Sequence, residues 1–313
     1  MRILNFGSLN IDHVYHVHHF VRPGETLSAD NLEYFCGGKG LNQSIALSKA
    51  GAEVYHAGKI GRDGLQLKAT LEENKVNTHY LEQTDVVNGH ALIQVNREGE
   101  NSIIIYGGSN RTISEDYVDR VLSDFSEGDL VLLQNEISCI SYIARKCSEM
   151  GIKVAFNPSP MEKDLLDKFP FHLVSILLIN EIEGHELTGK NTLQEMLDAL
   201  MERYPNTSVI LTLGSRGVVY HDLNHTYYHG TYDVAVKDTT AAGDTFTGFF
   251  LACLARGANI PECLEKASAA SSLAVSKRGA SASIPTMDEV NRMLEELRYR
   301  EFADGSSLSL SFE

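Results

Sequence analysis

The 313-residue sequence predicts an α/β protein built on a mostly parallel sheet. Short apolar runs alternate with helix-length segments along most of the chain. The run 130–133 is apolar throughout and 209–213 is apolar except for Thr212, as expected for strands that helices cover on both faces. Gly51 and Gly151 follow helix-like segments, at the position where helices usually end. Together these observations predict a three-layer α/β/α arrangement.

The sequence predicts six strands and six helices in the body of the fold. Strands are expected at residues 3–6, 53–58, 130–133, 154–156, 175–179 and 209–213. Helices are expected at residues 41–50, 65–74, 140–150, 243–256, 262–275 and 287–300. Since neither a linker nor an internal repeat interrupts this alternation, we expect one domain over residues 1–313, with residues 304–313 frayed.

Two stretches do not fit the parallel pattern. Residues 26–35 are extended and mix polar with apolar side chains. Residues 90–95 and 102–106 flank a polar turn, which predicts a β-hairpin. Because these segments cannot easily join a parallel core, we expect a small separate sheet, formed by about residues 26–35 and 90–106, that acts as a lid over a pocket.

Composition and charge narrow the class of partner. Forty-two acidic against 27 basic residues give a formal charge of −15, which repels nucleic acid and anionic lipid, so neither is an expected partner. No apolar run is long enough to cross a membrane. The five cysteines are odd in number, scattered and without a Cys-x-x-Cys pair, which favours reduced thiols in the cytoplasm; they are Cys36, Cys139, Cys147, Cys253 and Cys263.

The segment 238–244, DTTAAGD, carries the strongest functional signal. Its small residues Ala241, Ala242 and Gly243 open a helix, and exposed backbone N–H groups at a helix start bind anions such as phosphate. Asp244 in the first turn could accept the proton of an attacking hydroxyl group. The alternative is a well-capped buried helix with Asp244 as a first-turn acid.

Two segments nearer the N-terminus suggest a site for a polyhydroxy ligand. Gly38, Lys39 and Asn42 lie in a glycine-rich turn that enters a helix, although the spacing is not that of a Walker A motif. Asn10 and Asp12 follow the first strand and, two residues apart, point the same way in an extended chain. The alternative for the glycine-rich segment is an ordinary loop before a helix. The alternative for Asn10 and Asp12 is a turn held by Asx hydrogen bonds.

Four histidines gather near the N-terminus, His13, His16, His18 and His19. Two of them would share a strand face, which raises the possibility of a metal site. No third ligand with matching spacing is evident, so solvated or hydrogen-bonded histidines are the favoured interpretation.

Taken together, these segments resemble the ribokinase family, also called the PfkB carbohydrate kinases. The resemblance runs from Phe6 to about Pro285 and rests on the glycine-rich segment 37–42 and on 238–244. Within the family the likeness to the ribokinases is strongest, through Asn10-x-Asp12 and the segments 23–26, 97–101 and 212–217. It implies a ribokinase-like three-layer fold with a β-sheet lid.

The resemblance also implies site residues. The sugar would be held by Asn10, Asp12, Gly38, Lys39, Asn42 and Glu136, beside Asp244. ATP and Mg²⁺ would be held by Asn180, Glu183, Thr212, Gly214, Ser215, Gly217, Gly243 and Ser268. A K⁺-like activating cation would be held by Asp238, Thr240, Ala274, Lys277, Gly279 and Ser283, mostly through carbonyl oxygens.

Three of these positions have a plain structural alternative, and three residues depart from the family's usual pattern. Asn180 and Glu183 could simply cap a helix, and Glu136 could be a surface acid. Leu41 replaces a small residue and is expected to narrow the sugar pocket. Ser268 replaces a larger residue on the adenine side, and Lys277 can offer a cation only its carbonyl oxygen.

The implied activity is ATP-dependent phosphorylation of a primary hydroxyl group, with D-ribose giving D-ribose 5-phosphate as the leading expectation. Deoxyribose, a ketohexose or a nucleoside is the alternative acceptor. A sugar-binding regulator without catalytic activity is the alternative class, although such a protein has no need of a proton acceptor like Asp244. The resemblance further implies a homodimer formed through the lid.

Overall fold

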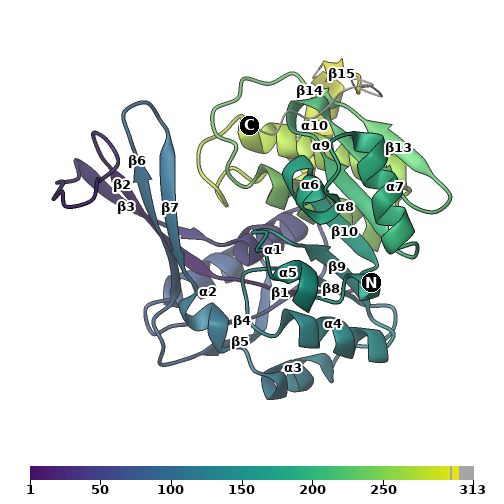
Figure 1. The fold of residues 1–313 in the computed structure, drawn as a ribbon, viewed down its shortest axis with the longest axis horizontal. Coiled ribbons are helices and arrows are strands. Elements are labelled where there is room, and N and C mark those ends of the chain that lie inside the picture. Colours follow the sequence, from purple (N-terminus) through teal and green to yellow (C-terminus); the bar gives the residue numbers. More distant parts are fainter. Residues whose placement is uncertain (297, 303–313) are drawn as a thin grey trace.

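The computed structural model describes residues 1–296 and 298–302, and its central element is a nine-stranded sheet (Figure 1). In spatial order its strands are β13 (Thr226–His229), β12 (Val218–His221), β11 (Ser208–Thr212), β10 (Ile176–Asn180), β9 (Lys153–Asn157), β8 (Leu130–Gln134), β1 (Ile3–Phe6), β4 (Val54–Ile60) and β5 (Asn77–Gln83). Pairing is parallel from β11 to β5, and only β12 and β13 join it antiparallel. The expected mostly parallel sheet is confirmed.

Ten helices accompany the strands in the described part of the chain. They are α1 (Lys39–Lys49), α2 (Leu65–Glu73), α3 (Glu115–Leu122), α4 (Ile140–Glu149), α5 (Leu165–Lys168), α6 (Glu181–Thr188), α7 (Leu193–Arg203), α8 (Ala242–Ala255), α9 (Ile260–Val275) and α10 (Met287–Glu296). None of these helices is long and apolar enough to cross a bilayer.

Alternate side chains of the strands enter two separate cores. Leu130 and Leu132 pack with α1, α8 and α9 on one face of the sheet. Val131 and Leu133 pack with α3, α4 and α7 on the other face. This alternation, which follows from the two-residue period of a strand, produces the three-layer α/β/α arrangement.

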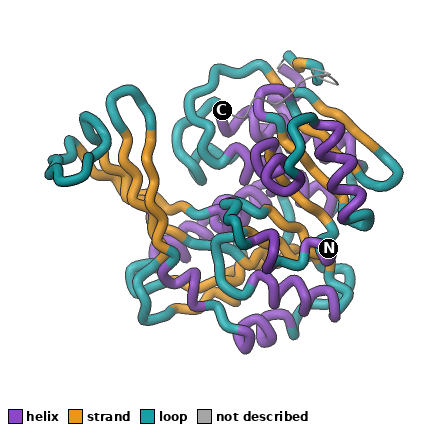
Figure 2. Tube along the Cα trace, viewed as in Figure 1, coloured by secondary structure: helices purple, strands orange, loops and turns teal. Residues whose placement is uncertain are grey.

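A second sheet projects from the body as an arm (Figures 1 and 2). Its strands, in spatial order, are β3 (Asn31–Gly37), β2 (Asn10–His16), β6 (Gly89–Val95) and β7 (Asn101–Tyr106). The β6–β7 hairpin lies where the sequence predicted it. The central strand β2 was not anticipated, because its side chains are mostly partly buried on both faces and give no clear alternation.

The prediction of a helix over residues 287–300 is wrong for its C-terminal end. α10 stops at Glu296, and β15 (Tyr299–Arg300) pairs with β14 (Thr231–Tyr232). An ion pair between Arg300 and Asp233 accompanies this pairing. The fraying expected for residues 304–313 lies outside the described residues.

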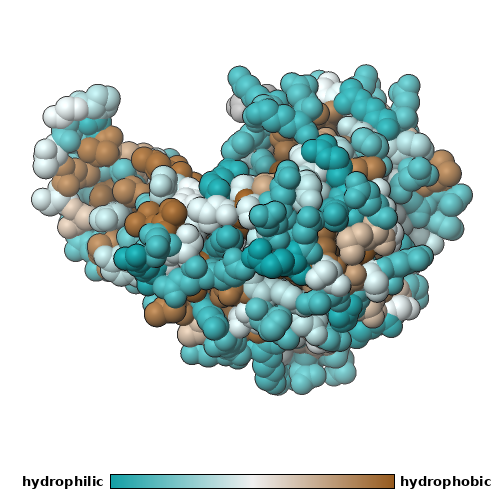
Figure 3. Space-filling model, turned by 90° about the horizontal axis from the view of Figure 1, so that it is seen from below, coloured by the Kyte–Doolittle hydropathy of each residue, from teal (hydrophilic) through white to brown (hydrophobic). Residues whose placement is uncertain are grey.

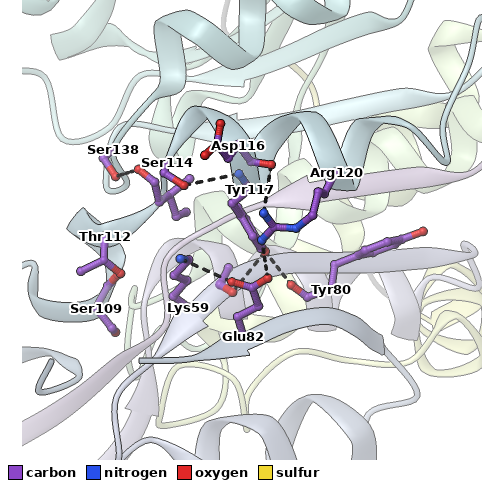
Figure 4. A network of polar contacts seen from close by, with 12 residues as sticks. Lys59, Tyr80, Glu82, Ser109, Thr112, Ser114, Asp116, Tyr117, Arg120 and Ser138 are labelled. Atoms are coloured by element: carbon purple, nitrogen blue, oxygen red, sulfur yellow. Dashed lines mark hydrogen bonds and ion pairs between the residues drawn. The ribbon is translucent and has the colours of Figure 1, made fainter. Parts of the chain in front are cut away.

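Figure 4 shows how α3 is fixed to the β4–β5 edge of the sheet. The Tyr117 hydroxyl donates to the carbonyl oxygens of Gly58 at 3.2 Å and Tyr80 at 2.5 Å. Arg120 lies over the Tyr117 ring and pairs with Glu82 of β5 at 2.9 Å. Since these contacts satisfy one another, the cluster is a structural support.

Candidate active site

The segment 238–244 forms a tight turn that opens α8. Ala241 adopts a left-handed conformation with φ 60°, and the helix begins at Ala242. The Ala242 amide donates to the Thr239 carbonyl at 3.2 Å, whereas the amides of Gly243 and Asp244 donate to no acceptor among the described residues. A Cβ added to Gly243 would meet nothing within 4 Å. The helix start therefore presents free amides to open space, which suits an anion.

The Asp244 carboxylate is buried and held from both sides. Asn42 Nδ2 donates to Oδ2 at 3.0 Å, and Gln43 Nε2 donates to Oδ1 at 2.8 Å. Both donors come from the first turn of α1, about 200 residues earlier in the chain. The structure thus brings together the two segments that carried the strongest sequence signals.

The glycine-rich turn fits tightly against the end of β1. Gly38 has φ 97°, and a Cβ on Gly40 would lie 2.3 Å from the Ser8 amide nitrogen. Glu136, just beyond β8, accepts hydrogen bonds from the Lys39 amide at 3.1 Å and from the Ser8 hydroxyl. Glu136 is therefore an internal hydrogen-bond acceptor at this edge of the sheet.

A cavity of about 280 Å³ opens between the arm and the body. Asn10 and Glu136 line it, together with Ile103, Ile105 and Asn110. Asn110 Nδ2 donates to Asn10 Oδ1 at 2.8 Å and so orients this side chain. Asp12, Gly38 and Asn42 line neither this cavity nor its neighbours among the described residues.

The charged groups around the turn influence one another. Burial, with a contribution from Glu136, raises the pKa of Asp12 to about 7. Burial also raises the pKa of Glu136, although nearby Lys39 opposes the shift. For Lys39, burial lowers the pKa, but the negative charges of Asp244, Glu136 and Glu183 outweigh it and the net shift is upward. A cationic Lys39 therefore lies among three carboxylates.

A second cavity, of about 260 Å³, lies between Lys39 and the start of α8. Asn180 and Glu183 line it, and each also caps α6: Asn180 Oδ1 accepts from the Glu183 amide at 2.9 Å, and Glu183 Oε2 accepts from the Asn180 amide at 3.0 Å. The capping alternative is thus realised, yet it does not remove these residues from the cavity. Their oxygens, with that of Asn157, are ligands of the kind that Mg²⁺ prefers.

A third cavity, of about 360 Å³, continues from the second and shares Thr212 and Gly243 with it. The six residues expected beside the nucleotide all line this cavity: Thr212, Gly214, Ser215, Gly217, Gly243 and Ser268. Gly217 has φ 113°, and a Cβ there would lie 2.2 Å from the His229 carbonyl oxygen. Val236 and Val275 add apolar walls, which suit a flat aromatic base.

The residues expected to hold a monovalent cation flank the α8 turn. Asp238 accepts from the Thr240 amide at 2.9 Å and from the Gly279 amide at 2.9 Å. No donor among the described residues reaches the carbonyl oxygens of Asp238, Thr240 and Gly279, so these are available to a cation.

Two of the remaining members of that set already take part in hydrogen bonds. The Ala274 carbonyl accepts from the Lys277 amide at 3.1 Å, and the Ser283 hydroxyl donates to the Ala280 carbonyl at 2.8 Å. Lys277 Nζ pairs with Glu289 at 3.1 Å, but the Lys277 carbonyl oxygen, the group expected to meet a cation, accepts from no donor among the described residues. The free carbonyl oxygens near Asp238 therefore fit a cation better than Ala274 and the Ser283 hydroxyl do, and that of Lys277 stays available.

The N-terminal histidines lie on the arm beside acidic residues. His16 contacts Glu33 at 2.7 Å, and His19 contacts Glu25 at 2.9 Å. His13 instead packs edge-on against the Tyr34 ring. No cluster of metal-ligating side chains occurs among the described residues.

One expectation is corrected, and several residues were missed. Leu41 is fully buried in the core and lines none of the three cavities, so the idea that it narrows the sugar pocket is wrong. Gln43, Asn110 and Asn157 were not anticipated. They are polar residues whose contacts arise only from tertiary packing, so no local signal marks them.

Comparisons with known proteins agree with this geometry. Residues 2–287 match the model of the pfkB family carbohydrate kinases. The chain is 34% identical to a ribokinase of Haemophilus influenzae over 298 residues, 92% of this chain and 97% of that protein. It is 28% identical to a deoxyribokinase of Salmonella typhi over 304 residues, 94% of this chain and 99% of that protein.

Structural similarity extends over the same length. The solved structure of Arabidopsis thaliana ribokinase complexed with ribose and ATP superposes with a TM-score of 0.80 and 30% identity. The match covers 94% of this chain and 98% of the plant protein. The free amides of α8 and the buried carboxylate beside them agree with the family match. Because that match extends over nearly the whole chain, the protein belongs to the pfkB family of carbohydrate kinases.

Proposed function

We propose that the protein transfers the γ-phosphoryl group of ATP to the primary hydroxyl group of D-ribose, forming D-ribose 5-phosphate and ADP. The observation that carries the proposal is the buried Asp244 carboxylate beside the free amides of α8. The ribokinases named above support ribose as the acceptor. Three cavities, of which the second and third adjoin, offer places for sugar, phosphates and nucleotide base.

In the proposed reaction the sugar hydroxyl oxygen attacks the γ-phosphorus, and the bond to the bridging oxygen of ADP breaks. The hydroxyl proton passes to Asp244, whose carboxylate has lone pairs left after accepting from Asn42 and Gln43. The amides at the α8 start and the Lys39 ammonium group stabilise the charge on the transferred group. A water-excluded position of Asp244 strengthens these interactions.

Two cations fit the chain's own ligands. Asn180 and Glu183 would hold Mg²⁺, which would neutralise charge on the ATP phosphates. The free carbonyl oxygens of Asp238, Thr240 and Gly279 would hold K⁺ and thereby stiffen the turn that carries the α8 amides. Both assignments rest on the kinds of oxygen that these residues offer.

The sugar would be recognised by residues that offer both donors and acceptors. Asn10 and Glu136 line the sugar-side cavity, and Lys39, whose amide donates to Glu136, lines the phosphate-side cavity. We propose that Asp12, Gly38 and Asn42 complete the set when the arm closes on the sugar. Asp12 would then pair with ring hydroxyl groups, and an analogue that lacks one of them would leave a buried carboxylate unpaired.

The experiment is steady-state turnover with a panel of acceptors: ribose, deoxyribose, fructose and a nucleoside. Ribose is expected to have the highest kcat/KM. Deoxyribose is expected to be about fivefold to a hundredfold poorer, because losing one buried pairing costs roughly 1–3 kcal/mol. A rival acceptor with a kcat/KM tenfold above that of ribose would leave the family correct and the substrate wrong. Binding of sugar without any ATP turnover would favour a regulator.

We further propose that the arm pairs two copies of the chain. Large apolar side chains lie exposed on it, and Figure 3 shows them gathered along the projecting part of the surface. They include Tyr34 (61% exposed), Ile104 (63%) and Ile105 (54%). An exposed apolar strand edge invites association. Sedimentation at micromolar concentration should find a dimer that Ile104→Lys weakens, and a fully active monomer would contradict the proposal.

The cytoplasm is the compartment that we propose for this enzyme. All five cysteines are free thiols in the structure, and three of them are buried. Free thiols persist in a reducing compartment. Titration of the natively purified protein with a thiol reagent after unfolding should find five reactive groups, whereas a disulfide would argue for another compartment.

A further inference from the structure

Gln43 contacts the proposed base without lining any of the three cavities. Its side chain is fully buried in the first turn of α1. Its Nε2 donates to Asp244 Oδ1 at 2.8 Å and to Asn157 Oδ1 at 3.3 Å. Because Gln43 has no exposed surface and is absent from the linings of the described cavities, it can act on a ligand only through Asp244 and Asn157, which both line the second cavity.

The orientation of the Gln43 amide is set from behind. Gln43 Oε1 accepts from Gln134 Nε2 at 2.7 Å, and the same nitrogen also donates to Asn5 Oδ1 at 2.9 Å. Asn5 Nδ2 in turn donates to Ser44 Oγ at 2.8 Å, and Ser44 Oγ lies 2.8 Å from His56 Nδ1. A continuous series of hydrogen bonds therefore connects Asp244 in α8, through side chains of α1, β8 and β1, to His56 in β4.

The bonds from Asp244 to Ser44 each have only one satisfactory direction. An ionised carboxylate only accepts hydrogen bonds, so Gln43 must turn its NH₂ group to Asp244 and its oxygen to Gln134. Gln134 must then present its NH₂ group, and Asn5 its oxygen, which leaves the Asn5 NH₂ group for Ser44. The last bond joins Ser44 Oγ to His56 Nδ1. Burial lowers the pKa of His56 to about 4, so the ring is neutral, and its tautomer sets which of the two atoms donates.

All members of the chain are secluded from solvent. Asn5, Gln43, Ser44 and His56 are fully buried, and Gln134 is 1% exposed. Buried polar groups of this kind cost stability unless all are paired, and replacing them by apolar side chains is often no worse for the fold. A connected polar chain that ends on the proposed base is therefore better explained by orientation of that base than by stability.

We propose that Gln43 is the positioning residue of Asp244, holding the carboxylate in the orientation that accepts the hydroxyl proton, and that Gln134 fixes the Gln43 amide in the required direction. This inference rests on the proposed role of Asp244 as proton acceptor. The hydrogen bonds from Gln134 through Asn5 and Ser44 to His56 would then prevent a flip of the Gln43 amide. Such a flip would turn the Gln43 oxygen toward the Asp244 carboxylate.

The test compares Gln43→Leu and Gln134→Leu with the parent, using the acceptor that gives the parent its highest kcat. Gln43→Leu is expected to lower kcat about tenfold to a hundredfold, since a misplacement of about 1 Å can cost that much. Gln134→Leu is expected to cause a smaller loss. KM for sugar and for ATP should stay within about twofold in both variants, because neither residue touches a ligand. Thr207→Val is the matched control: it removes a buried bond to the Val174 carbonyl, far from the site, and should leave kcat unchanged.

A double-mutant cycle decides whether Gln43 acts through Asp244. In the Asp244→Asn background, Gln43→Leu is expected to cause no further loss of the residual turnover. An equal loss in both backgrounds, a kcat within threefold of the parent or a matching rise in KM would overturn the proposal. If Gln43→Leu does not fold, Gln43→Leu combined with Gln134→Leu removes both partners and serves in its place.

Failure of this inference can be told from failure of the proposed function. If ribose is not the best acceptor, the substrate proposal is wrong, while the cycle still decides the role of Gln43. If Asp244→Asn itself retains the parent kcat, the role of Asp244 is wrong, and the role of Gln43 is overturned with it.

Discussion

Gly248 is the place where a single methyl group should disturb both the packing and the chemistry. It lies one turn after Asp244 in α8, where this helix crosses α1. A Cβ at this position would lie 2.3 Å from Ala46 Cβ and 2.8 Å from the Leu47 nitrogen. Ordinary carbon–carbon contacts are about 3.5–4.0 Å, so the two helices must separate by roughly 1–1.5 Å. Neither obstructing atom belongs to a side chain that can swing away.

The expected cost of Gly248→Ala follows from that separation. Overpacking costs about 1–3 kcal/mol, here near the upper end because backbone obstructs, and the better helix propensity of alanine returns about 1 kcal/mol. The net loss of about 2 kcal/mol corresponds to a Tm lower by roughly 3 °C for a chain of this size. Since α1 carries Asn42 and Gln43, the same displacement pulls both donors from Asp244, and kcat should fall about a hundredfold.

Calorimetry and steady-state kinetics measure both effects, with Gly184→Ala in α6 as the control. A Cβ on Gly184 would meet the flexible ends of Met196 and Leu211 at 3.2 and 3.3 Å, so they can give way. That variant should keep or raise its Tm. A Gly248→Ala enzyme with the Tm and kcat of the parent would refute the packing argument. A lowered Tm with an unchanged kcat would refute the coupling between helix spacing and the base.

Three further predictions concern the site directly. Asp244→Asn should lower kcat by about 10²–10⁴-fold while sugar binding, measured by calorimetry, survives, and a kcat within tenfold of the parent would exclude Asp244 as the base. Activity should rise with K⁺ and be weaker in Na⁺ because a cation at the free carbonyl oxygens near Asp238 stiffens the α8 turn, and equal rates in K⁺-free buffer would remove this site. Since the pKa of Asp12 is raised to about 7, its carboxylate gains a proton as pH falls through 7, and KM for sugar should rise about tenfold from pH 8 to pH 6. Asp12→Asn should abolish that dependence, and a KM independent of pH in the parent would argue against an ionised Asp12 at the sugar.

The body of the fold could be predicted because its strands are local signals. The residues of β8 are all buried, and the first four of them form a continuous apolar run in the sequence. β2 gave no such signal because six of its seven residues are partly buried, so neither face of the strand stands out. The antiparallel pair β12 and β13 was missed for a different reason: each strand has only four residues and mixes polar with apolar side chains.

The site could be anticipated where its residues are neighbours in the chain. Asp244 and the small residues before it form one turn, and the turn's chemistry can be recognised from the sequence. Gln43 could not be recognised, because a glutamine in a helix is ordinarily exposed. Its burial depends on α8, and the residue to which it binds is 201 positions away.

The position of β1 in the middle of the sheet has a consequence for synthesis on the ribosome. One edge of β1 pairs with β4, but the other waits for β8, whose residues start at Leu130. At about 5–20 residues per second, that edge stays open for several seconds after β4 emerges. The waiting edge carries Ile3, Leu4 and Phe6, all fully buried in the finished fold. A nascent chain that stalls before β8 therefore exposes an apolar strand, and we expect slow translation of the segment between β4 and β8 to lower the yield of folded protein.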